Sequence, residues 1–463
     1  MKILAVSGHD RQAAAALAVD GRIVAASSED AFVRVPGVGY AQTGGFPESA
    51  VEACLASTGL SIDEVDEVAI VCAERARSVP DAALPLATHG RPVRTVDALL
   101  ADAVQASLSA PAGSAVLVSS SSPCEFVAFE PQDGGLRAGR AVSGGQALPA
   151  VARAFALVLG LPAGDPYAAI DRLSVGGEQE FPSEFDELLA WHGDKGLDAR
   201  PDKLDGLVAR LAGSKVADLA DAGSLNQRVQ DLRRGLAASF VCRLAEIVRL
   251  AAETLVGRED LSEVAFGGDL VSHARLRGEL RQRVGGEIAT AAVPELAGRA
   301  LGAALSSGRA ADPLPALALG PSFSDQDIKR VLDNCRLDYV YEPDWARLHH
   351  RVSRMLEQGK LVGWFQGALG FGPRAMGSRS ILCDPSNRYA RQNMNEYLRH
   401  LPVDEPLPVV FSPSMMAGCL TSAAPAPMAV ADVDVDPAWH DRLNSALDWR
   451  RRVRVQALGP VQA

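Results

Sequence analysis

The first residues of the chain alternate short apolar segments with polar turns, and this pattern restricts the folds that the chain can adopt. Apolar segments run from Ile3 to Ser7, from Ala13 to Val19 and from Arg22 to Ser27. The last two are separated only by Asp20-Gly21, a pair that favours a tight hairpin because glycine accepts positive φ angles. The sequence therefore predicts that the chain opens with a three-stranded β-meander.

The segments after this meander indicate an α/β layer fold with an internal duplication. A helix is predicted from about Pro47 to Ser57 and a strand from Glu67 to Cys72. Further strands are predicted at 115–118, 125–129 and 263–266, with helices at 147–159 and 224–256 and a turn over the serines at 119–122. Repeated strand sets with crossover helices fit the actin-like, ribonuclease-H-like architecture, although periodicity alone also allows other α/β folds.

The length of the chain predicts two domains, because 463 residues exceed what one hydrophobic core usually organises. The text around residues 306–325 is rich in proline and alanine, which is typical of a connection between domains. We therefore predict an N-terminal domain over residues 1–310 and a smaller α/β domain over residues 318–463.

Composition and charge narrow the class of protein further. The chain is 48% hydrophobic and 22% charged, as soluble globular proteins are. Its net charge of −11 and the lack of a basic run argue against nucleic acid as a partner. No apolar run reaches the roughly 18 residues of a membrane span. Seven scattered cysteines without a Cys-x-x-Cys pair indicate reduced thiols, so we expect a cytoplasmic protein that acts on a small molecule.

The segment from Gly363 to Leu382 carries the most specific chemical pattern. Its closely spaced glycines let the backbone approach a ligand, and Arg374 and Arg379 offer guanidinium groups that suit phosphate or carboxylate. The functional interpretation is an anion-binding loop. The alternative is a turn in which both arginines only pair with acidic neighbours.

This segment also resembles a known family. Residues 371–382, FGPRAMGSRSIL, are similar to the pattern FGPRALGNRSIL of the nodulation-factor and antibiotic O-carbamoyltransferases. Weaker similarity extends over His9-Asp10, Gly267-Gly268, residues 300–305 and residues 319–324. The family's NTSFN stretch has no counterpart after Arg454-Val455-Gln456. By this resemblance the chain is identified as a degenerate and C-terminally truncated member.

The resemblance implies a fold, a reaction and a set of site residues. It implies an actin-like N-terminal domain of the ASKHA class, which transfers a carbamoyl group to a hydroxyl. It also implies a YrdC-like C-terminal domain that makes carbamoyl adenylate from carbamoyl phosphate and ATP with magnesium. Nucleotide or carbamoyl-phosphate binding falls on Gln366, Arg374, Arg379, Ser380, Gly267 and Gly268.

His9 is the candidate catalytic residue. A neutral imidazole can act as a base near neutral pH or can position a substrate hydroxyl. The alternative is that His9-Asp10 belongs to a structural turn without a chemical role.

The resemblance further implies a metal site that this sequence does not complete. The family's HHxxHA stretch corresponds to residues 98–103, ALLADA, and the aspartate of its VDG stretch corresponds to Ser119. The aspartate of its GDxG stretch corresponds to Leu296. Alanine and leucine offer no ligand to a divalent metal, so no metal site is predicted.

These losses lead to one leading hypothesis and two alternatives. The leading hypothesis is a non-catalytic or half-active subunit in natural-product biosynthesis, which partners an intact carbamoyltransferase paralogue or forms a homo-oligomer. The first alternative is an active ATP- and carbamoyl-phosphate-dependent O-carbamoyltransferase, or a related transferase, with a rebuilt, metal-free site. The second is a small-molecule-binding regulatory module that uses only the arginine loop.

Overall fold

The computed structural model describes most of the chain. The described residues are 1–72, 90–132, 134–162, 164–212, 219, 226–307, 317–372, 377–401, 403, 405, 407–411, 413–421, 430–443, 445–447 and 452–456. None of the helices among these residues combines the length and the hydrophobicity that a membrane span needs. The predicted domain boundary falls partly on residues 308–316, outside this range, and stays a prediction.

The first sheet contains the predicted meander. Its strands are β1 (Lys2–Ser7), β2 (Ala14–Val19), β3 (Arg22–Ser28), β4 (Glu67–Cys72) and β5 (Val93–Asp97). Their order is β3-β2-β1-β4-β5. The first three strands pair antiparallel, and β4 and β5 run parallel to β1. Both residues of the Asp20-Gly21 turn have positive φ, as the hairpin prediction requires.

The second sheet repeats this topology. Its strands are β6 (Val116–Ser121), β7 (Cys124–Gln132), β8 (Gly135–Gly145), β11 (Ala265–Gly267) and β12 (Ala289–Thr290). Their order is β12-β11-β6-β7-β8, with an antiparallel meander and two strands parallel to β6. Because one strand order occurs twice, the predicted actin-like fold of the N-terminal region is confirmed.

The predicted turn over the serines at 119–122 is wrong for most of its length. Ser119, Ser120 and Ser121 belong to β6 and pair with β7, so that only Ser122 and Pro123 form the turn. All three serines of the strand are buried. Their backbone groups need partners once they are buried, and the β7 ladder supplies them.

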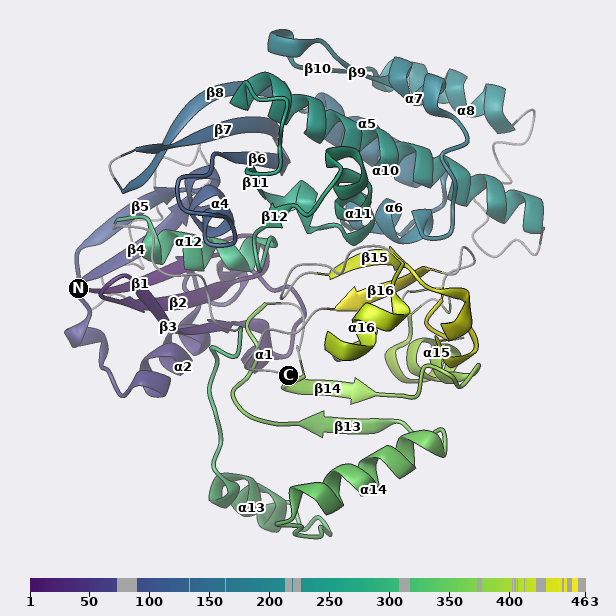
Figure 1. The fold of residues 1–463 in the computed structure, drawn as a ribbon. Helices are drawn as coiled ribbons and strands as arrows, with labels where there is room; N and C mark the ends of the chain where they lie inside the picture. The colour runs from purple at the N-terminus through teal and green to yellow at the C-terminus, as the bar shows by residue number, and fades with distance from the viewer. Residues whose placement is uncertain are drawn as a thin grey trace.

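Helices and sheets alternate in five layers (Figure 1). The helices of these layers are α2 (Glu48–Thr58), α4 (Ala98–Ser107), α10 (Gln227–Val256) and α12 (Arg299–Leu305). α2 covers the outer face of the first sheet and α10 the outer face of the second. Between the sheets, α12 packs on β1 and β2, α4 packs on β6 and β11, and the two helices touch each other. This pair of inner helices joins the two halves.

The remaining elements before residue 310 lie around the second sheet or at the edge of the first. They are α1 (Asp30–Val33), α5 (Ala147–Val158), α6 (Pro166–Ser174), α7 (Pro182–Leu188), β9 (Leu189–Trp191), β10 (Leu197–Ala199), α8 (Leu204–Ala212) and α11 (Ala274–Val284). The largest buried cluster joins α5, α10 and α11 to β7. Within it, Phe155, Phe185 and Phe240 pack ring against ring, with centroids 5.1–6.1 Å apart.

The C-terminal region is smaller and is also α/β. Its elements are α13 (Asp325–Asn334), α14 (Trp345–Glu357), β13 (Val362–Phe365), β14 (Arg379–Leu382), α15 (Ala390–Gln392), a π-helical turn (Asn393–Arg399), α16 (Pro413–Cys419), β15 (Val430–Asp434) and β16 (Arg452–Gln456). β13 pairs antiparallel with β14, and β15 with β16. A separate small core forms around Phe411, Val433 and Val455.

A buried charge network fixes α11 against α10. Glu279 is 8% exposed, and its carboxylate lies 2.6 Å from Arg275 Nη2 and 2.7 Å from Arg283 Nη1. Arg283 also reaches Glu246 of α10 at 3.5 Å. Burial by itself would raise the pKa of Glu279, but the two arginines outweigh it and hold this pKa below its ordinary value.

Glu279 therefore makes stability depend on pH in a predictable direction. A carboxyl whose pKa is lowered by folding stabilises the fold above its unfolded pKa of about 4.3, and this contribution is lost as pH falls through the folded pKa. We expect Glu279→Gln to cost about 1–3 kcal/mol at pH 7, with a gap to the unsubstituted protein that narrows below about pH 4.3. Urea unfolding between pH 3 and pH 7 measures this. Glu263→Gln is the control, because Glu263 is exposed and lies 4.0 Å from Arg258.

Candidate functional site

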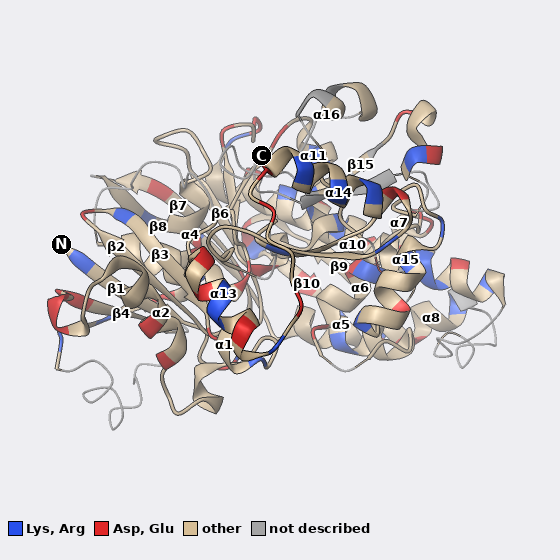
Figure 2. Cartoon of the chain, turned by 90° about the horizontal axis from the view of Figure 1, so that it is seen from below, with Lys and Arg blue, Asp and Glu red and all other residues tan. Residues whose placement is uncertain are grey.

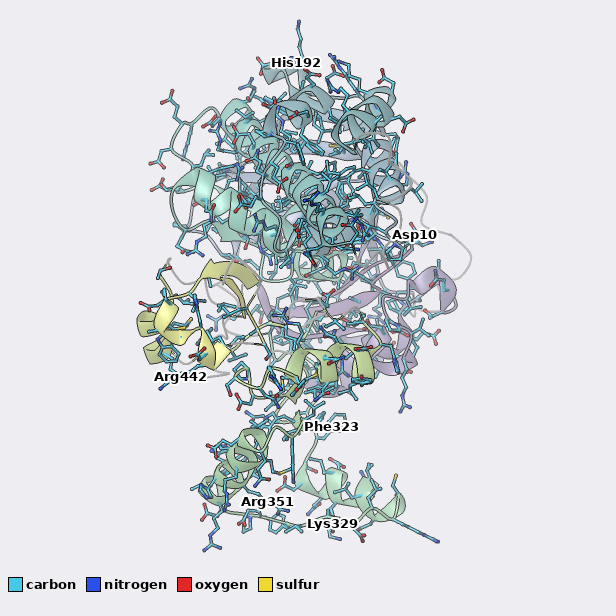
Figure 3. The ribbon with its side chains drawn as sticks, turned by 90° about the vertical axis from the view of Figure 1, so that its right-hand side faces the viewer. Asp10, His192, Phe323, Lys329, Arg351 and Arg442 are labelled. Atoms are coloured by element: carbon cyan, nitrogen blue, oxygen red, sulfur yellow. The ribbon has the colours of Figure 1, made fainter. Side chains whose placement is uncertain are left out.

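His9 lies in the connection between β1 and β2. Its Nδ1 is 2.8 Å from Asp10 Oδ1, and its ring meets that of Tyr40 edge to face with centroids 5.2 Å apart. The side chains of His9 and Asp10 are 47% and 90% exposed. Figure 3 shows Asp10 at the surface. The imidazole of His9 is therefore accessible to solvent, and its catalytic role stays a prediction.

In the second half, the end of β6 corresponds to the end of β1, and the carboxylate of Asp269 binds the backbone and hydroxyl groups there. Ser121, at the end of β6, donates its backbone N–H to Asp269 Oδ1 at 2.7 Å and its hydroxyl to the other carboxylate oxygen. Gly268, just before Asp269, has a φ of 90°, and a Cβ there would lie 2.2 Å from Ser119 O. Gly267 likewise lies against α4. The Gly267-Gly268 pair thus has a packing role, and its nucleotide-binding role stays a prediction.

Both hairpins converge on the N-terminus of α6. Asp165 caps this helix by accepting from Tyr167 N and Ala168 N. Arg11, from the β1–β2 connection, lies 3.3 Å from Asp165, and Tyr167 donates its hydroxyl to Ser121 O at 3.4 Å. This arrangement brings the His9 connection of the first half near the closed end of β6 in the second half.

The predicted anion-binding segment forms the β13–β14 hairpin. Gln366 N donates to Ser378 O at 2.9 Å, and its side chain accepts from Trp364 Nε1 at 2.9 Å. Arg379 pairs with Phe365, and Ser380 pairs with Trp364. Because side chains alternate along a strand, exposed Arg379 and half-buried Ser380 lie on opposite faces. Arg374 lies outside the described residues.

The hairpin loop is anchored in the N-terminal half by Phe371. This ring is 1% exposed and belongs to the cluster that contains α12, Val293 and Leu317. Gly372, with a φ of 93°, follows it, and a Cβ there would meet the Val293 side chain at 2.9 Å. The loop that carries the FGPR motif therefore starts at the inner helices of the actin-like region.

The residues at the implied metal site do not fit a metal. Ala98 and Leu99 are buried in the apolar clusters around α4, and Ser119 Oγ donates to Gly267 O at 3.3 Å. Asp102 is the one carboxylate at these positions, and both its oxygens accept from Arg299. In the described part of the chain, no three His, Cys, Asp or Glu side chains are grouped to hold a metal ion. The expectation that no metal binds at these positions stays a prediction.

The ion pair between Asp102 and Arg299 is the feature that sequence reasoning missed. Arg299 Nε lies 3.0 Å from each carboxylate oxygen of Asp102, and Nη2 lies 2.8 Å from Oδ2. Asp102 is 2% exposed. An acidic residue in the otherwise apolar stretch ALLADA was the available signal, because buried charges need partners.

Comparison with known sequences points to one family. Residues 353–462 match the family described as carbamoyltransferase C-terminus. An uncharacterized protein of Synechocystis is 30% identical over 45% of this chain and 35% of its own length. Nodulation protein NolO of Bradyrhizobium diazoefficiens is 34% identical over 22% of this chain and 20% of its own. The chain thus spans about a third or less of the length of these relatives.

Solved structures overlap with the chain only loosely. The activator of 2-hydroxyisocaproyl-CoA dehydratase from Clostridium difficile, 12% identical, covers 74% of this chain and 100% of its own with a TM-score of 0.41. The ROK hexokinase of Thermus thermophilus, 19% identical, covers 66% and 97% with a TM-score of 0.35. The fold assignment rests on the repeated strand order of the two sheets.

The close contact between α4 and α12 can be tested with glycine substitutions. A Cβ at Gly302 would lie 1.9 Å from Ala101 O, so we expect Gly302→Ala to separate the helices and to cost about 1–3 kcal/mol. Gly206 in α8 has open space at the same position, so Gly206→Ala should stabilise by about 0.5–1 kcal/mol. Chemical denaturation measures both, and equal effects would contradict close packing at Gly302.

Proposed function

The chain belongs to the carbamoyltransferase family, and from this premise we propose that it is a non-catalytic or half-active subunit beside an intact carbamoyltransferase. In this proposal the pair acts in natural-product biosynthesis. The intact partner completes carbamoyl transfer, and this chain contributes at most the activation of carbamoyl phosphate with ATP and magnesium.

One observation carries the proposal: a long part of the C-terminal region buries none of its side chains. Residues 321–370 include α13, α14 and β13, and every one of them is exposed or half-buried. Figure 1 shows α13 and α14 standing apart from the rest of the molecule, and in Figure 3 Lys329 and Arg351 lie on this extension. A two-stranded hairpin with a loosely packed helix is marginally stable alone, so such a segment gains stability from a covering partner.

This region also exposes a set of large apolar side chains, which we name the open face. The side chains that form it are each between 43% and 73% exposed: Phe323, Val331, Leu337, Tyr339, Val340, Tyr341, Trp345, Phe365 and Ile381. Isolated exposed apolar residues are ordinary, but a group from neighbouring elements marks a protein-interaction surface. Aromatic residues are also enriched among those that contribute most to binding at interfaces.

The charges beside the open face favour a homologous chain as its partner. α14 carries Arg347, Arg351 and Arg354, whereas α13 and the connection after it carry acidic residues at 325, 327, 333, 338, 342 and 344. Figure 2 shows acidic and basic residues together along α13. The ion pairs of these helices are local, such as Lys329–Asp333 at 2.6 Å. A related segment turned by a two-fold rotation would set acidic residues against α14.

The side chains at the implied metal positions support the part of the proposal that denies this chain complete carbamoyl transfer. A divalent metal would act in transfer by polarising the reacting group as a Lewis acid. The side chains at the implied positions are apolar or already paired. The chain's own residues therefore favour a role other than complete, unaided carbamoyl transfer.

Association can be tested by substitution within the open face. We expect Tyr341→Asp to weaken binding to an intact carbamoyltransferase of the same genome at least about tenfold, because it places a charge in an apolar contact. Leu157→Asp is the matched control, since Leu157 and Tyr341 are both 72% exposed and Leu157 lies on α5. Surface plasmon resonance measures the affinity. If the chain instead associates with itself and Tyr341→Asp abolishes this association, the partner is a second copy of this chain and not a paralogue.

Activation can be tested separately by carbamoyl-phosphate-dependent exchange of pyrophosphate into ATP, with magnesium. If the subunit is half-active, exchange proceeds and Arg379→Ala lowers it at least about tenfold, because a guanidinium contact to an anion is lost. Arg388→Ala is the control, since Arg388 stacks on Tyr389 with 4.5 Å to the ring centroid. If no exchange occurs with the chain alone or with its partner, the subunit is non-catalytic and not half-active. Carbamoyl transfer by the chain alone would contradict the proposal.

A further inference from the structure

Asp102 is a carboxylate buried at the contact between the two halves. It lies on α4 and is 2% exposed. Its neighbours on that helix, Ala101 and Ala103, are completely buried and apolar. A carboxylate in such surroundings requires a positive charge close by, because water is excluded.

Arg299 supplies this charge from the first residue of α12. Its side chain is 16% exposed, and it contacts both oxygens of Asp102 with donor–acceptor distances between 2.8 and 3.0 Å. This bidentate contact uses the planar geometry of the guanidinium, which a lysine ammonium cannot reproduce.

The surrounding backbone leaves no room for a larger group. A Cβ at Gly298 would lie 1.9 Å from Val293 O, and one at Gly302 would lie 1.9 Å from Ala101 O. On the other side, a Cβ at Gly267 would lie 3.0 Å from Asp102 O. α4, α12 and β11 thus enclose the ion pair closely.

The other carboxylates near Arg299 are already used. Asp97 accepts from Leu99 N and Leu100 N as the N-cap of α4, and Asp269 accepts from Ser121. The pKa of Arg299 is raised: burial would lower it, but Asp102 opposes this strongly, and Asp269 and Asp97 add smaller effects. Among the residues that the structure describes, Asp102 therefore has no second free carboxylate with which to share a metal.

We infer that the guanidinium of Arg299 takes the place of the divalent cation that the family resemblance implies. Asp102 stands at the position of the third histidine of the HHxxH stretch, and Arg299 directly follows residues 295–298, which correspond to the GDxG stretch. The protein thus carries its own cation on α12, and this cation joins the two halves and excludes metals. The inference rests on family membership and not on the proposed subunit role, so either can fail without the other.

The inference predicts chemical rescue. Arg299→Ala leaves a buried carboxylate with a cavity shaped for guanidinium, so the variant should lose roughly 5–10 °C in Tm. Millimolar guanidinium or methylguanidinium should restore at least about half of this loss, whereas sodium chloride at equal ionic strength should not. Differential scanning calorimetry measures both. Arg299→Lys, which keeps the charge, should fold and should lose less than the alanine variant.

Two controls make rescue specific. The Asp102→Ala/Arg299→Ala double variant lacks the carboxylate, so guanidinium should not raise its Tm. Arg347→Ala removes the partner of Asp344 in a surface pair, with side chains 77% and 49% exposed and 3.4 Å between the charged atoms, and should cause only a small loss without rescue. The inference would be overturned if guanidinium raised the Tm of the double variant equally. It would also be overturned if guanidinium did not raise the Tm of Arg299→Ala and Arg299→Lys lost no Tm.

Metal content provides a readout independent of stability and activity. After equilibrium dialysis against manganese, iron(II) or zinc, elemental analysis should find the same metal content in the unsubstituted protein and in Asp102→Ala. One equivalent of metal that is present in the unsubstituted protein and lost in Asp102→Ala would show that Asp102 is a metal ligand and would overturn the inference.

Discussion

The contact between α4 and α12 is the constraint on which the rest of the structure depends. Each helix covers the inner face of one sheet, so the spacing of the two halves is set by how closely these helices approach. Gly302 permits backbone contact with Ala101, and Arg299 binds Asp102 beside it. Because close packing and a buried ion pair act at one contact, a relative movement of the halves would leave a charge without its partner.

The C-terminal region is held to this contact at one end and is open at the other. Phe371 is buried in the cluster that contains α12, and Ala26 N donates to Leu319 O at 2.9 Å from the first sheet. Between these two points, residues 321–370 bury no side chain. A segment fixed at both ends but uncovered along its length presents its surface in one orientation, which reduces the entropy that a partner must overcome on binding.

Local signals in the sequence predicted the elements, whereas the decisive contact is not local. The first meander followed from apolar spacing and Asp20-Gly21, and the same strand order in the second half confirmed the duplication. The strand residues Ser119–Ser121 were missed because polar side chains hid a buried strand. Strand periodicity could have shown that Arg379 and Ser380 face apart. Asp102 and Arg299 are 197 positions apart, so no local pattern could pair them.

A cation carried on a side chain differs from a bound metal in its reversibility. A metal leaves when its concentration falls or a chelator competes, but a tethered guanidinium stays at high effective concentration beside Asp102. A histidine placed at position 102 would also leave Arg299 buried without its carboxylate. Ligands would still be lacking at Ala98, Leu99 and Leu296. A metal site at these positions would therefore require several simultaneous changes, the first of which destabilises the contact that holds the two halves together.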